Sequence, residues 1–208
     1  MLKLRSFFAA LGLSALLTAP AMADAASESF VRDNGTRVLS SLDDPDLNAT
    51  ERADQFSNYM DELSNFNRVS NFVIGKYARR FSPEELAEYR AAFRAYNLAA
   101  YQVQFDEYRG SDIIVTGSTD RSETDSIVNS TIRTTDGDEL DVRWRVLSRS
   151  GNYEVVDVAL NIDGQLLWLA IEQRAQFLDL LDRENGSAAA LISKLKDLTA
   201  ELKAELRG

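Results

Sequence analysis

The sequence predicts an α+β protein in which helices pack against one face of a four-stranded antiparallel sheet. Two observations support this prediction. Apolar residues recur at spacings of three and four before residue 108 and again after residue 164. Between these regions lie four strand-like runs, and two glycine turns join the last three of them. Consecutive hairpins make an antiparallel meander, and its apolar face needs a covering layer of helices.

Residues 1–23 have the pattern of a cleavable secretory signal peptide. Lys3 and Arg5 precede an apolar run over residues 7–17, and Ala21-Met22-Ala23 is a small-x-small cleavage site. The run is shorter than the roughly 20 apolar residues that a transmembrane helix needs. We therefore expect cleavage after Ala23, which leaves a single domain over residues 24–208.

Three helices are predicted before the strands. The first covers residues 26–42, and the second covers residues 50–66 with Thr50 as its cap. The third begins at the capping box Ser82–Glu85, with proline at the first helical position, and ends near Tyr108. The second half of this third helix is apolar on two opposite sides, which is typical of a helix between two layers.

The strand-like runs have a clear apolar face. They are predicted at Asp112–Ser118, Ser126–Thr134, Glu139–Ser148 and Tyr153–Ile162. The segments "TTDGDE" and "RSGN" supply the two hairpin turns. Successive residues of a strand point to opposite faces, so alternation places one set of apolar side chains together: Leu140, Val142, Trp144 and Val146 on one strand, and Val156, Val158, Leu160 and Ile162 on the next.

The remaining residues are predicted to be helical. Leu166–Ile171 is nearly all apolar and leads into an amphipathic helix, which Gly186 ends. Ser187 then caps a last helix, whose leucines form one stripe.

The composition excludes several classes of function. The chain of 208 residues has 33 acidic and 23 basic residues, and loss of the signal peptide takes its net charge from −10 to −12. This acidity argues against nucleic acid as a partner, because phosphate backbones bind basic patches. The chain has no histidine and no cysteine, so it lacks disulfides, the usual ligands of zinc, haem, iron–sulfur and copper, and the usual activated nucleophiles. We therefore expect no metal and no cofactor.

Carboxylates are the remaining candidates for catalysis. Asp141, Asp157, Asp163 and Glu172 could serve, but no spacing singles one out, and a solvated or structural role is favoured for each. Asp157 lies between two valines, where a structural hydrogen bond is the favoured interpretation. "DDPDLNATE" lacks the glycine and the spacing of an EF-hand calcium loop, so it is interpreted as a capped turn.

The apolar residues exceed what one sheet face requires. They include bulky side chains of the kind that line pockets, namely Tyr96, Tyr101, Trp144 and Trp168. A stripe at helical spacing usually fills a core, but such a surplus could also wall a cavity for an acyl chain. Burying an acyl chain stabilises by roughly 0.8 kcal/mol per CH₂, so this kind of site needs no charged residue.

Four segments resemble one family in their order and spacing. They are "VIGKYARRFSPEELAEYRAAFRAY" followed by Tyr101, "GDELDVRWRV", "YEVVDVAL", and "LAIEQRAQFLDLL" followed by "NGSAAALISKL". Together they resemble the MlaC-type periplasmic phospholipid-binding proteins, the toluene-tolerance auxiliary transport family, over residues 71–196. The chain departs from the family pattern in two places. "NIDGQLLWLAIEQR" replaces a shorter Gly-hydrophobic-Ser stretch, and Gln173 stands where many members have tyrosine.

The resemblance implies a cystatin-like or NTF2-like sheet with helices over an apolar cavity that holds phospholipid as cargo. It implies a monomer in the periplasm of a Gram-negative bacterium, which would carry glycerophospholipid between the outer and inner membranes and maintain outer-membrane lipid asymmetry. Its partners would be an outer-membrane lipoprotein complex and an inner-membrane ABC transporter with an MCE-type subunit. Face assignment and resemblance together predict these lipid-binding residues: Phe72, Tyr77, Phe93, Tyr96, Tyr101, Val142, Trp144, Val146, Val156, Val158, Trp168 and Phe177.

Two other functions stay open from the sequence. The chain could be a periplasmic interaction module with a solid core, which an empty, well-packed structure would favour. It could also be an enzyme, because cone-shaped sheets of this kind host several chemistries. Such an enzyme would need a buried acid with a raised pKa, and Asp157 is the only candidate. The lipid-carrier hypothesis, which is not enzymatic, is the one that the sequence favours.

Overall fold

The computed structural model describes residues 24–106, 108–162 and 164–206. The predicted signal peptide and the candidate acid Asp163 lie outside these described residues. The described helices are α1 (Ala25–Leu42), α2 (Ala49–Leu63), α3 (Phe66–Ile74), the 3₁₀ helix η1 (Gly75–Arg79), α4 (Pro83–Asp106), α5 (Leu169–Arg183) and α6 (Ala188–Glu205). The strands are β1 (Asp112–Ser122), β2 (Asp125–Arg133), β3 (Glu139–Arg149), β4 (Asn152–Ile162) and β5 (Gln165–Trp168).

The described strands form one antiparallel sheet in the order β1-β2-β3-β4-β5. The prediction of an antiparallel meander is confirmed, but the prediction of four strands is wrong, because residues 165–168 add a fifth strand. This strand pairs with the end of β4 through Ile162↔Gln165 and Ala159↔Trp168. Gly164, with φ +81°, lies in the intervening turn and adopts the left-handed conformation that favours glycine. A short apolar run cannot be assigned to helix or strand from periodicity alone, which explains the error.

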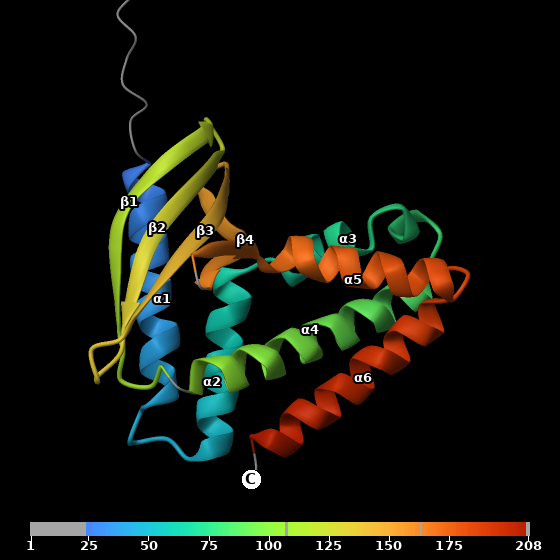
Figure 1. Ribbon diagram of the computed structural model, residues 1–208, viewed down its shortest axis with the longest axis horizontal. Coiled ribbons are helices and arrows are strands. Elements are labelled where there is room, and N and C mark those ends of the chain that lie inside the picture. The colour runs from blue at the N-terminus through green and yellow to red at the C-terminus, as the bar shows by residue number, and fades with distance from the viewer. Residues whose placement is uncertain (1–23, 107, 163, 207–208) are drawn as a thin grey trace, which may run out of the picture.

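The helices form two groups, which α4 connects (Figure 1). α1 lies along the sheet and packs on β1 and on α2. α3, α5 and α6 extend away from the sheet and pack on one another and on the first part of α4. The prediction that helices cover one sheet face therefore applies to α1, α2 and the end of α4, whereas the other helices form a bundle beside the sheet.

Helix starts follow capping chemistry closely. The side chains of Ser82 and Glu85 exchange hydrogen bonds with each other's backbone N–H at 3.1 and 2.8 Å, which confirms the predicted capping box. Asn48, rather than the predicted Thr50, caps α2 and forms a second capping box. α2 ends at Leu63, and Asn65 caps α3, so the predicted helix over residues 50–66 is interrupted at Ser64.

The corner at Ser64 is fixed to the sheet. The Ser64 hydroxyl donates to the carbonyl of Val155 at 3.0 Å, and the Asn65 amide donates to the Glu154 carboxylate at 2.8 Å. α1 also approaches the sheet closely, because a Cβ at Gly35 would lie 2.7 Å from Cδ1 of Ile113. These contacts hold α1 and α2 over the helix-facing side of the sheet and leave a pocket between them and α4.

Candidate apolar binding site

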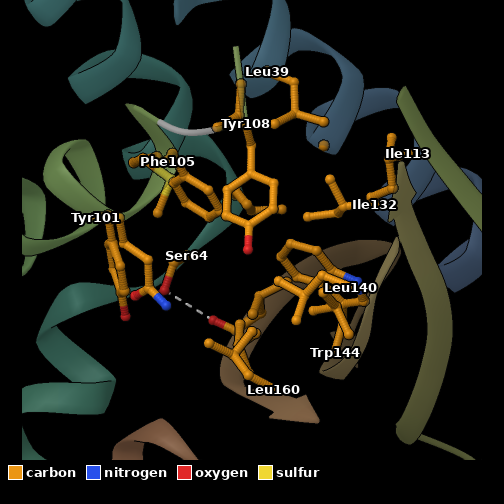
Figure 2. Close-up of a pocket in the computed structure, with 18 of the residues that line it drawn as sticks. Leu39, Ser64, Tyr101, Phe105, Tyr108, Ile113, Ile132, Leu140, Trp144 and Leu160 are labelled. Carbon is orange, nitrogen blue, oxygen red and sulfur yellow. Dashed lines mark hydrogen bonds between the residues drawn. The ribbon is translucent and has the colours of Figure 1, made fainter. Parts of the chain in front are cut away.

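An apolar pocket lies between the sheet, α1, α2 and the end of α4 (Figure 2). α1 and α2 contribute small and aliphatic side chains, including Leu39 and Met60. Ile113, Ile132 and Leu140 line it from one end of the sheet. None of the described side chains that line this pocket is charged, so the site can desolvate an apolar ligand without leaving a buried charge unpaired.

Strand register explains which side chains form the pocket wall. Directly paired residues share a face, and Trp144 pairs with Val128 on β2 and with Val158 on β4. The Trp144 indole N–H donates to the Ser130 hydroxyl at 2.7 Å, so its polar atom is satisfied within the wall. Val158 lies in the middle of this face yet is only half-buried, because it borders the open space of the pocket.

A β-bulge changes the face assignment of β4. Val146 pairs with Val155 and Arg145 pairs with Asp157, so Val156 has no direct partner. The extra residue places Val155 and Val158 in the pocket wall, whereas Val156 lines a hollow beside Arg145 and a second, small hollow that adjoins the pocket. The predicted alternation from Val156 to Val158 is therefore wrong at Val156.

Three aromatic rings from the end of α4 form the opposite wall. The ring centroids of Tyr101 and Phe105 are 6.2 Å apart, and those of Phe105 and Tyr108 are 6.5 Å apart. Figure 2 shows Phe105 and Tyr108 projecting between the helices and the sheet. Gln104 also lines the pocket and is exposed, so the pocket reaches the surface beside α4.

The enclosed space of the pocket is small. Its empty space totals about 780 Å³ including the part open to solvent, but only about 50 Å³ accommodates the centre of a water-sized molecule. Pockets for drug-sized ligands measure about 300–1,000 Å³. A ligand with long acyl chains therefore requires the walls to separate.

The structure brings together four of the predicted lipid-binding residues. Tyr101, Val142, Trp144 and Val158 line the pocket. Val146 is buried on the same face of β3 but does not line it. The pocket also has lining residues that the face assignment did not predict: Val38, Leu39, Met60, Leu63, Phe105, Tyr108, Ile113, Ile132 and Val155. Alternation within the first two strands was an available signal for Ile113 and Ile132, whereas the contribution of α1 and α2 depends on tertiary packing.

The other predicted residues lie in the helical bundle or on the opposite sheet face. Phe93 and Phe177 form an edge-to-face pair with centroids 6.2 Å apart in the bundle core. Tyr77 is buried, and its hydroxyl donates to Asp182 at 2.5 Å. Phe72 is 43% exposed beneath the Arg174 guanidinium, which lies 5.0 Å from its ring centroid.

Tyr96 and Trp168 also lie outside the pocket lining. Tyr96 is partly buried against the core, and burial raises the pKa of its hydroxyl. Trp168 pairs with Ala159, whose neighbours Val158 and Leu160 face the pocket, so the register places Trp168 on the opposite face of the sheet.

Asp157 has the structural role that its position between valines predicts. Its Oδ1 accepts the backbone N–H of Val158 at 2.9 Å and that of Ala170 at 2.8 Å. The second bond satisfies a free N–H in the first turn of α5 and ties that helix to β4. Burial raises the pKa of the Asp157 carboxyl, whereas these two hydrogen bonds and the charge of Arg145 act in the opposite direction. Burial also raises the pKa of the nearby Tyr101 hydroxyl, and the Asp157 carboxylate adds to this effect.

Removal of this acceptor gives a testable stability difference. Asp157→Ala leaves two backbone N–H groups without an acceptor and should lower the free energy of unfolding by about 2–4 kcal/mol. Asp157→Asn retains an acceptor oxygen and should cost less. Because the folded-state pKa is raised, the folded wild type binds the proton more tightly, so its stability relative to Asp157→Asn should fall as pH rises above the usual carboxyl value of 3.8. Urea unfolding between pH 3 and pH 8 measures both effects, and equal losses for the two variants would contradict the hydrogen-bond role.

Two further features of the described residues bear on function. No group of three or more acidic side chains is placed to hold a metal ion within the parts of the chain that the structure describes. Among the helices over residues 24–206, none is long and apolar enough to cross a membrane.

The sheet, its helical cover and the uncharged pocket define an α+β protein with an internal apolar site. The sequence model of the MlaC protein family matches residues 32–197, and the chain belongs to that family. The fold is similar to that of the phospholipid-binding protein from Ralstonia solanacearum, whose structure was determined in complex with a phospholipid. The TM-score is 0.72 at 22% sequence identity, over 85% of this chain and 98% of the other. Among curated proteins, none matches this sequence.

Proposed function

We propose that this protein binds a phospholipid, with the acyl chains in the apolar pocket and the headgroup near solvent. The observation that carries the proposal is the pocket between the sheet and α4, in which none of the described lining side chains is charged. Membership of the MlaC family and the fold shared with a phospholipid-binding protein support it. In this proposal the fold is cystatin-like or NTF2-like, and the cavity widens when lipid enters.

The proposed role is that of a periplasmic carrier rather than an enzyme. The aqueous space between two membranes is a large hydrophobic barrier to a free phospholipid. A protein that exchanges water contact for pocket contact lowers this barrier, at roughly 0.8 kcal/mol per buried CH₂ before the costs of binding. Removal of the signal peptide after Ala23 would release residues 24–208 into the periplasm.

Further parts of the proposal follow from family membership. The carrier would act as a monomer and would exchange glycerophospholipid with an outer-membrane lipoprotein complex and with an inner-membrane ABC transporter that has an MCE-type subunit. Such a route would maintain outer-membrane lipid asymmetry. The acidic chain, with a net charge of −10 before cleavage, would be repelled by anionic lipid surfaces, which favours transfer through partner proteins.

Native mass spectrometry of the protein purified from the periplasm under mild conditions tests the central claim. We expect a mass excess that solvent extraction resolves into glycerophospholipid, with one lipid for each chain. Protein stripped of lipid should reload from vesicles of phosphatidylcholine, which carry no net charge and so do not repel the acidic chain. A bare mass together with failure to reload would contradict lipid binding and would favour an interaction module without cargo.

A further inference from the structure

The aromatic rings at the end of α4 occupy the space that faces the sheet wall. Phe105 lies between Tyr101 and Tyr108, and its ring centroid is 6.3 Å from that of Phe56 on α2. Figure 2 shows the Tyr108 ring extending from the chain toward the side chains of the sheet. Tyr101, Phe105 and Tyr108 are each only partly buried, whereas the facing wall residues Val142 and Trp144 are buried.

The two walls differ in how firmly they are held. The sheet wall consists of paired strands, and α1 is pressed against it where Gly35 meets Ile113. α4 ends at Asp106, and the turn that follows includes hydrogen bonds from the Tyr108 N–H to the Phe105 carbonyl at 3.0 Å and from the Ser111 N–H to the Tyr108 carbonyl at 3.1 Å. The last carbonyls of a helix lack intrahelical partners, so this end can rearrange at lower cost than a strand within the sheet.

The small enclosed volume of the pocket indicates which side chains must move before an acyl chain can enter. The pocket offers about 50 Å³ to the centre of a water-sized molecule, which is too little for an acyl chain. Phe105 and Tyr108 are the bulky side chains of the less firmly held wall, so their displacement creates space with the least disruption. Their remaining volume then limits how far a chain can extend into the pocket.

We propose that Phe105 and Tyr108 form an aromatic plug that sets the length of acyl chain the pocket accepts. This inference rests on the proposed lipid binding and adds its specificity determinant. A smaller side chain at either position leaves room for additional methylene groups. Each buried CH₂ strengthens binding by roughly fourfold, so room for two more corresponds to about a fifteenfold gain for longer chains.

Lysophosphatidylcholines with 12, 14, 16 and 18 carbons provide a graded probe. Delipidated wild-type protein is titrated with each one, and bound ligand is measured by native mass spectrometry. For the wild type, affinity should rise with chain length up to a limit. Tyr108→Ala and Phe105→Ala should each move that limit upward by about two carbons, with about fifteenfold tighter binding of the longest chain. Tyr108→Trp should move the limit downward.

Tyr59→Ala is the control, because Tyr59 on α2 is, like Tyr108, a half-buried tyrosine but does not line the pocket. It should leave the chain-length profile unchanged. Identical profiles for the wild type, Tyr108→Ala and Tyr108→Trp, all folded by circular dichroism, would overturn the plug. If Tyr108→Ala fails to fold, two other variants test the same proposal. Tyr108→Leu should raise the chain-length limit, and Tyr108→Trp should lower it. Wild-type protein that binds none of the four lipids would instead refute the proposed lipid binding.

Discussion

Val158→Trp is expected to abolish phospholipid occupancy while leaving the protein folded. Val158 lies in the middle of the pocket wall and is only half-buried, so an indole can extend into the open space rather than into packed neighbours. Trp144, which pairs with Val158 across β3 and β4, would then face a second large ring. The combined bulk would exclude several methylene groups, and loss of only two costs about fifteenfold in affinity. Native mass spectrometry and reloading from vesicles measure the loss.

Val156→Trp provides the matched control for this substitution. Val156 is the same residue type on the same strand, but the bulge leaves it without a direct partner on β3, and it lines the hollow beside Arg145 and a small adjoining hollow rather than the pocket itself. It should retain lipid at close to the wild-type level, and circular dichroism should show that both variants are folded. Loss of lipid in both variants would mean that strict alternation assigned the two valines to the pocket face correctly and that the bulge is misplaced, whereas loss in Val156→Trp alone would mean that Val158 does not line the lipid site.

The pocket wall on β3 was predictable from sequence, whereas the wall on β4 was predictable only in part. Val142 and Trp144 alternate with charged residues, so a period of two was enough to assign their face. β4 carries two adjacent valines, Val155 and Val156, and the sequence does not show which of them is paired. Only the register with β3 reveals the bulge, because the bulge is a relation between two strands.

The helical aromatic residues show a different limit. Their spacing predicted two apolar sides of one helix, and the structure shows that this helix crosses from the bundle to the sheet. Phe93 and Tyr101 share α4, yet Phe93 packs in the bundle and Tyr101 lines the pocket. Periodicity reports which side of a helix is apolar and says nothing about which neighbour covers each turn. The contribution of α1 and α2 to the pocket was unpredicted for the same reason.

Phe93→Ala is expected to cause the largest loss of stability among these variants. Phe93 is fully buried, and its ring centroid lies 6.2 Å from that of Phe177 and 5.9 Å from that of Tyr89. Truncation removes these contacts and leaves a cavity between α4 and α5, at a cost of about 3–5 kcal/mol in the free energy of unfolding. At about 2–4 °C per kcal/mol for a chain of this size, Tm should fall by roughly 6–20 °C.

Phe72→Ala is the comparison, because that ring is 43% exposed and its main partner is the Arg174 guanidinium. It should cost about 1 kcal/mol or less. Both variants are measured by urea unfolding and by lipid loading well below the Tm. Neither ring lines the pocket itself, although Phe93 lines a small hollow that adjoins it, so each folded variant should load lipid at close to the wild-type level. Loss of loading in folded Phe93→Ala would instead place this ring in the lipid site, as its helical spacing first suggested, and would require the cavity to reach into the bundle when it widens.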